Sequence, residues 1–365
     1  MDYLLNDEQT MLADALGRFV AERAGSDRKS SPESVAELWT GFAKLGWLGV
    51  PFAQDHGGYG LGAVGNMIVA ERIGSGALRA PYISSVVGAG GVLARCANAF
   101  SNLENLMNGA RRIALGLFDD GRGYQPYGTA TICTPIGDGY RLTGTKLNVM
   151  EIAGADAVIV SAQIDGGSEI ALIELALDTP GVIVTPYHFA DGRQAARIDM
   201  NGTFVGSAAR LDKGDASAII DAVISDILAA AAADNVGAMQ MLFDSTLDYV
   251  KSRRQFGRPI GSFQDIQFRL VDMWIKLDEA RSLVMTASMA LTDRKDDARA
   301  LAAAAWIQSL WSGRLICEEA IQLHGAIGMT AECDVGRYVK RILVNGLLYG
   351  APEHYLRHSQ TTFVS

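Results

Sequence analysis

The stretch Tyr140-Arg-Leu-Thr-Gly-Thr-Lys-Leu-Asn-Val149 is one of five short runs of β-forming residues in the middle of the chain. Short runs of this kind, bounded by turn residues, are typical of β-strands. The other four runs cover residues 113–118, 157–162, 170–175 and 182–186. Together they predict a β-domain over residues 112–211.

Helical periodicity flanks this region on both sides. Before it, Asn6 and Gln9 form a predicted capping pair ahead of an apolar stripe made of Leu12, Leu16 and Phe19. After residue 211 long helices are predicted, and one of them carries the stripe Ile266, Leu270, Met273, Leu277, Ala280 and Val284. We therefore predict helical regions over residues 1–111 and 212–365.

The order helices, sheet, helices predicts an α+β fold, because strands do not alternate with helices as a doubly wound parallel sheet requires. Residues 60–65 match the pattern GxGxxG by letter. A dinucleotide fingerprint needs a strand directly before it and an acidic residue about 20 positions later, and neither is present. A Rossmann fold is therefore disfavoured.

Composition excludes several classes of protein. The net charge of -9 argues against nucleic acid as a partner, because phosphate-binding surfaces need an excess of Lys and Arg. No uncharged apolar run reaches about 18 residues, so no membrane span is predicted. The four cysteines show neither a CxxC pair nor a zinc spacing, and we expect reduced thiols, no metal site and a cytoplasmic location.

The stretch from Tyr249 to Gln264 holds the first candidate binding residues. Arg253 and Arg254 end a predicted helix, a glycine-punctuated turn follows, and a second helix starts near Phe263. Arginine presents a planar fork of donors that fits pyrophosphate oxygens, and Gln264 offers a hydrogen bond to a ribose or adenine. The alternative is that these cations only complement the helix macrodipole.

A second stretch, Gln322-Leu-His-Gly-Ala-Ile-Gly328, follows a predicted helix. Closely spaced glycines allow backbone amides to approach a phosphate or a flat ring. The alternative is a plain helix stop at glycine.

The two stretches and their separation resemble the acyl-CoA dehydrogenase family. Residues 45–51, 57–61 and 140–146 also match its motifs, so the resemblance covers essentially the whole chain. It implies a C-terminal four-helix bundle, FAD bound between subunits, an acyl-CoA substrate and electron-transferring flavoprotein as redox partner. The implied cofactor contacts are Arg253, Phe256, Gln264, Gln322, Leu323, His324, Gly325 and Ala326.

The sequence departs from the family where groups act within one subunit. The Thr-Glu-Pro-x-x-Gly-Ser-Asp loop beside the flavin ring is replaced by residues 118–125, with the bulky Phe118 and Tyr124 in place of the small Thr and Ser. The Trp-Ile-Thr segment is replaced by residues 148–150. In the family, a carboxylate removes the α-proton of the thioester, but its two familiar positions hold Tyr349 and Ile227. A tyrosine, with a pKa near 10, is a poor base at neutral pH.

Three interpretations remain open. The retained residues act across a subunit interface, so the chain resembles a base-lacking subunit that pairs with a homologous second chain, as in the heterotetrameric acyl-CoA dehydrogenases of bacterial steroid side-chain degradation. Their Tyr/Phe-Gly-x-Pro-x-x-His pattern is similar to residues 349–354, although the histidine comes one residue early. Alternatively, the chain forms a homo-oligomer that uses Asp226 or another carboxylate, or it is a non-catalytic scaffold. Dehydrogenase and oxidase are not separated.

Overall fold

The computed structural model describes residues 5–23, 32–97, 99–121, 123–124, 129–330 and 332–356, with only the backbone at 32–34. The chain divides into two compact units. The sheet unit comprises Lys29–Gly62 and Arg79–Ile227, and the bundle unit comprises Met1–Arg28, Ala63–Leu78 and Leu228–Ser365. The boundary between the units at Ile227 falls inside helix α6 (Ser217–Ser252).

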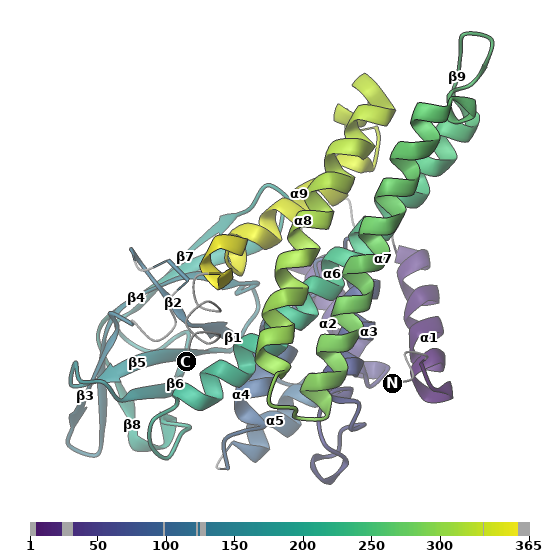
Figure 1. Cartoon of the computed structure of the whole chain (residues 1–365). Helices are drawn as coiled ribbons and strands as arrows, with labels where there is room; N and C mark the ends of the chain where they lie inside the picture. The colour runs from purple at the N-terminus through teal and green to yellow at the C-terminus, as the bar shows by residue number, and fades with distance from the viewer. Residues whose placement is uncertain are drawn as a thin grey trace. The chain divides into compact units, whose positions relative to one another are not determined.

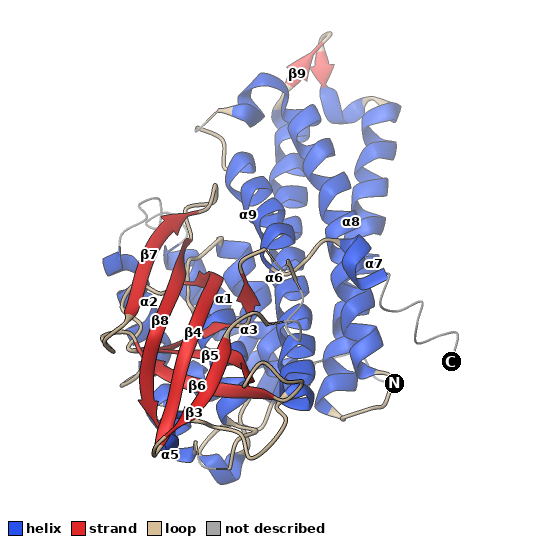
Figure 2. Ribbon diagram, turned by 90° about the vertical axis from the view of Figure 1, so that its left-hand side faces the viewer, coloured by secondary structure: helices blue, strands red, loops and turns tan. Residues whose placement is uncertain are grey.

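An eight-stranded sheet forms the centre of the sheet unit, and Figure 2 shows its twist in red. β4 runs antiparallel to β3, β8 and β2, whereas β5 is parallel to β1 and β3. The strands are β1 (Ile113–Gly116), β2 (Phe118–Asp119), β3 (Ile132–Ile136), β4 (Gly139–Met150), β5 (Ala157–Ile164), β6 (Ile170–Ala176), β7 (Val182–His188) and β8 (Gln194–Gly206). The five predicted strand regions are all present.

β3 and β8 lie outside the five predicted runs. β8 contains Ala, Asp, Asn and Gly, which are weak strand formers, yet it pairs with both β4 and β7. Its Ala196, Ile198 and Met200 alternate into the buried core of the sheet. Pairing on both sides therefore outweighs the low propensity of this strand.

Short helices and the first part of α6 complete the sheet unit. They are α2 (Pro32–Lys44), η1 (Trp47–Gly49), η2 (Gln54–His56), the π-helix η3 (Tyr82–Gly90), α4 (Gly91–Leu93), α5 (Phe100–Met107) and η4 (Ser207–Ala209). Within the range 32–97, no strand precedes residues 60–65, so the GxGxxG match is only one of letters.

The described part of the bundle unit contains six α-helices, and those after α6 are green to yellow in Figure 1. They are α1 (Asp7–Arg23), α3 (Gly62–Gly76), the second part of α6, α7 (Gln264–Thr292), α8 (Ala298–His324) and α9 (Val335–Leu348). The predicted capping pair is confirmed, since Asn6 and Gln9 exchange hydrogen bonds of 3.0 and 2.9 Å. The predicted stripe of α7 is buried from Leu270 to Val284. Helices precede and follow the strands along the chain, and this order confirms the predicted α+β fold.

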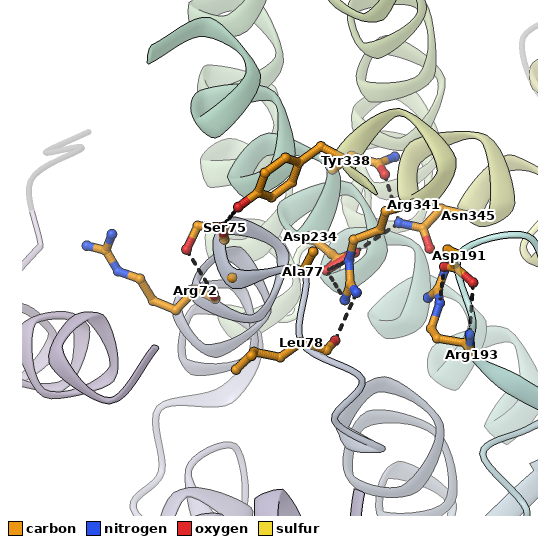
Figure 3. A network of polar contacts seen from close by, with 12 residues as sticks. Arg72, Ser75, Ala77, Leu78, Asp191, Arg193, Asp234, Tyr338, Arg341 and Asn345 are labelled. Atoms are coloured by element: carbon orange, nitrogen blue, oxygen red, sulfur yellow. Dashed lines mark hydrogen bonds and ion pairs between the residues drawn. The ribbon is translucent and has the colours of Figure 1, made fainter. Parts of the chain in front are cut away.

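Helix α3 is fixed to the bundle by a buried polar network, drawn in Figure 3. Asp234 of α6 accepts hydrogen bonds of 2.7 to 2.9 Å from Arg341 and Asn345 of α9. Arg341 also donates to the carbonyl oxygen of Leu78 at 2.8 Å, just past the end of α3. This network, which we call the Asp234 network, joins α3, α6 and α9.

No helix among the described residues is long and apolar enough to cross a membrane. The same residues contain no group of His, Cys, Asp and Glu that would hold a metal ion.

Candidate functional site

The first predicted cofactor stretch forms a short hairpin between α6 and α7. Its strands β9 (Arg254–Gln255) and β10 (Arg258–Pro259) pair antiparallel around Phe256 and Gly257, whose φ angles are 51° and 81°. A bulky residue at positive φ is an outlier, and such strain clusters at functional sites. The Phe256 side chain is 91% exposed, so the hairpin presents an aromatic ring at its tip.

Arg253 lies at the base of this hairpin with its side chain exposed. Its backbone is fixed on both sides, because its N–H donates to Tyr249 and its carbonyl accepts from Ile260, both at 2.8 Å. Among the described residues, its guanidinium has no hydrogen-bond or ion-pair partner. Gln264, also exposed, is the first residue of α7. The stretch therefore offers donors to an anion from outside this unit.

The second predicted stretch is the end of α8 and the turn η6 (Gly325–Met329). Gly325 has φ 66° and ψ -146°, a conformation open essentially only to glycine, and a Cβ built on it meets nothing within 4 Å. Gln322, Gly325 and Ala326 are exposed, whereas the side chains of Leu323 and His324 are buried. The open part of this turn is its backbone.

The structure brings the two stretches together through one ring contact. Tyr249 of α6 stacks on His324, with ring centroids 4.5 Å apart and an angle of 23° between the planes. The residue pattern alone did not single out Tyr249, although it lies one helical turn before Arg253. An unpaired arginine, a glutamine at a helix start and an unobstructed glycine turn fit a nucleotide with a pyrophosphate.

Tyr349, at the commoner position of the family's base, is held by aromatic and backbone contacts. Its ring packs edge-on against Trp306 with centroids 5.9 Å apart. The Trp306 indole N–H donates to the carbonyl of Gly350 at 2.8 Å, and the Tyr355 hydroxyl donates to the carbonyl of Tyr349. No carboxylate stands at this position.

Asp226, the weak candidate for a displaced base, belongs to the sheet unit and is ion-paired there. Its carboxylate accepts from Arg95 at 2.7 Å. Burial raises its pKa, and the charge and hydrogen bond of Arg95 act in the opposite direction. The neighbouring Ile227 is half-buried. Asp226 thus forms a salt bridge to the turn after α4.

The segments at the family's flavin-ring positions make contacts within their own unit. The rings of Phe118 and Tyr124 pack edge to face at 5.8 Å, and Arg122 and Gln125 of the same loop lie outside the described residues. The Tyr187 hydroxyl accepts from the N–H of Asn148 at 3.0 Å and donates to its side-chain oxygen at 2.7 Å.

Two buried residues of this region were not among the predicted site residues. Lys146 is fully buried and donates to Asp119, Thr129 and Ser161, each at 3.0 Å. Glu151 has φ 55° and accepts from the Ser84 hydroxyl at 3.1 Å. Lys146 stands in the matched segment 140–146, but nothing local to either residue signals its burial.

Comparison with known proteins identifies the family. The acyl-CoA dehydrogenase N-terminal domain matches residues 6–100, and the acyl-CoA dehydrogenase C-terminal domain matches residues 229–360. The probable acyl-CoA dehydrogenase YngJ of Bacillus subtilis (strain 168) is 29% identical over 93% of this chain and 93% of its own length.

Two solved structures share the fold over nearly the whole chain. The Tcur3481-Tcur3483 steroid ACAD variant has a TM-score of 0.89 and 25% identity, and covers 98% of both chains. The ChsE4-ChsE5 complex from Mycobacterium tuberculosis has a TM-score of 0.88 at 24% identity, over 100% of this chain and 99% of that chain. FAD is the cofactor of the family that the matching domains define. This chain therefore belongs to the acyl-CoA dehydrogenase family of oxidoreductases.

Proposed function

We propose that this chain is the base-lacking subunit of a heteromeric, FAD-dependent acyl-CoA dehydrogenase that acts in the cytoplasm. A homologous second chain supplies the carboxylate and the flavin-ring loop, and the substrate is a steroid-like acyl-CoA. The observation that carries the proposal is the contrast within the bundle unit: the face around Arg253 is open, whereas Tyr349 stands packed against Trp306 at the base position.

The residues of this chain bind and orient the cofactor in this proposal. Arg253 pairs with the pyrophosphate, Gln264 hydrogen-bonds the ribose or adenine, and the backbone of Gly325 and Ala326 approaches the cofactor without obstruction. Phe256 supplies an exposed ring at the hairpin tip. The chemistry that bound FAD would supply is acceptance of a hydride from the β-carbon of the thioester, with electron-transferring flavoprotein as the proposed electron acceptor.

The partner chain is required because the α-proton beside a thioester is weakly acidic and needs a positioned base. Asp226 is ion-paired with Arg95, and this pair favours a base that the partner chain supplies. The steroid-like substrate is supported by likeness to the Tcur3481-Tcur3483 steroid ACAD. The open cofactor face argues against a scaffold that has lost FAD.

Flavin content tests the proposal directly. The chain is expressed alone and together with a homologous chain that carries a carboxylate at the position of Tyr349, and FAD is measured by absorbance after purification. We expect little FAD on the chain alone and one FAD per pair of chains in the complex. Full flavin loading and dehydrogenase activity from the chain alone would contradict the proposal, and loss of that activity in Asp226→Asn would then establish the homo-oligomer. No flavin in any pairing would establish the scaffold.

A pair of arginine variants tests the cofactor contact. Arg253→Ala removes a charge-assisted hydrogen bond and should weaken FAD binding by about 1.5–3 kcal/mol, roughly 10- to 150-fold. Arg314→Ala is the matched control, because Arg314 is an exposed arginine of α8 that pairs with Glu318. Equal FAD dissociation constants for the two variants would remove Arg253 from the site.

A further inference from the structure

The stack of Tyr249 on His324 joins the two cofactor stretches at a buried point. His324 is 7% exposed, and its Nδ1–H donates to the carbonyl of Ala320 at 2.8 Å. Because a carbonyl oxygen only accepts, Nδ1 carries a hydrogen in this bond. The imidazole is therefore held on one face by Tyr249 and at its edge by its own helix.

Each partner of the stack is directly connected to one predicted contact with the cofactor. Tyr249 accepts the backbone N–H of Arg253 at 2.8 Å, one helical turn later. His324 directly precedes Gly325, and a Cβ built on Gly328 would lie 3.0 Å from the Cβ of His324. The stack thus sets the distance between the backbone of Arg253 and the turn η6.

We propose that His324 and Tyr249 are positioning residues for FAD, an inference that rests on the proposed function. Their stack holds Arg253 and η6 in the arrangement that receives the cofactor. The imidazole is buried between Tyr249 and α8, so it acts through the turn and does not touch the cofactor.

The size of the effect follows from the free energy of the stack. An aromatic pair contributes a free energy equivalent to about 2-fold to 12-fold in an equilibrium constant. Without the stack, cofactor binding must itself order the two stretches, and this ordering reduces the affinity. The loss of affinity is therefore bounded by the same factor.

The test compares leucine and phenylalanine at each position in the complex with the base-carrying homologous chain. His324→Leu and Tyr249→Leu keep apolar volume but remove one ring of the stack. His324→Phe and Tyr249→Phe keep both rings, and His324→Phe also removes both ring nitrogens. The FAD dissociation constant is measured by quenching of flavin fluorescence, and thermal unfolding shows which variants are folded.

We expect both leucine variants to weaken FAD binding by about 2-fold to 12-fold, with both phenylalanine variants within about 2-fold of the unchanged complex. If His324→Leu fails to fold, Tyr249→Leu provides the same comparison from α6. Unchanged affinity in the leucine variants overturns the inference. So does a His324→Phe complex as weak as His324→Leu, because the stack of rings would then not account for the affinity. If the complex without any substitution holds no FAD, the proposed function is overturned instead.

Discussion

Removing Arg341 from the Asp234 network should strongly destabilise the bundle unit. The side chains of Arg341 and Asp234 are 5% and 0% exposed, and three hydrogen bonds of 2.7 to 2.9 Å join them. Arg341→Met leaves the Asp234 carboxylate buried, with Asn345 as its remaining donor in the network. Breaking a buried pair in this way costs about 3–5 kcal/mol, because one charge stays in a low-dielectric site.

Urea unfolding at fixed protein concentration measures this cost, and a double variant separates its two contributions. Asp234→Leu combined with Arg341→Met replaces the pair by apolar residues and removes the uncompensated charge. Such replacements are often neutral or stabilising, so we expect the double variant to recover most of the loss.

Two results would refute this reasoning. A loss below about 1 kcal/mol for Arg341→Met would show that the carboxylate is not electrostatically isolated without Arg341. A double variant as unstable as the sum of both single variants would show that geometry, and not charge, governs the network.

Three further predictions concern other buried contacts. Burial lowers the pKa of Lys146 from 10.5 to about 8, so between these pH values the unfolded chain binds one more proton than the folded chain. Relative to Lys146→Met, the unfolding free energy should therefore rise by up to about 3 kcal/mol as the pH increases from about 8 to 10.5. A flat difference in urea unfolding would show an unshifted lysine. Gly237→Ala should lower the melting temperature, because the new Cβ would lie 1.9 Å from a backbone oxygen of α3. Gly336→Ala is the control and should raise the melting temperature, because nothing lies within 4 Å of the new Cβ. Equal melting temperatures for the two variants would contradict the close packing of α3 on α6. Trp306→Phe leaves the carbonyl of Gly350 without its indole donor and should cost about 1–3 kcal/mol in urea unfolding, and no loss would mean that water replaces the indole.

Local patterns were sufficient for the order of elements. The short runs of β-forming residues predicted five strand regions, and the capping pair of Asn6 and Gln9 predicted the start of α1. Strand β8 was not predicted, because its stability comes from pairing with β4 and β7, which are distant in the sequence. The packing of α3 was not predicted either, because Asp234 and Arg341 come together only in the folded bundle unit.

The candidate site divides in the same way. The arginine-glycine stretch after Tyr249 and the glycine turn after His324 are visible in the sequence, because donor chemistry and turn geometry depend on neighbouring residues. Their assignment as FAD contacts stays a prediction. That Asp226 is bound to Arg95 is a property of the folded sheet unit alone.

The helix–sheet–helix order, the family resemblance and the two stretches that offer donors to FAD are readable from the residues alone. Only the folded chain shows that Arg253 is exposed, that His324 is buried against Tyr249, and that Tyr349 at the base position is packed on Trp306. The physical reason is the separation along the chain over which each effect acts. Periodicity and turn chemistry act between near neighbours, whereas burial, ring stacking and ion pairing depend on residues that only the fold brings together.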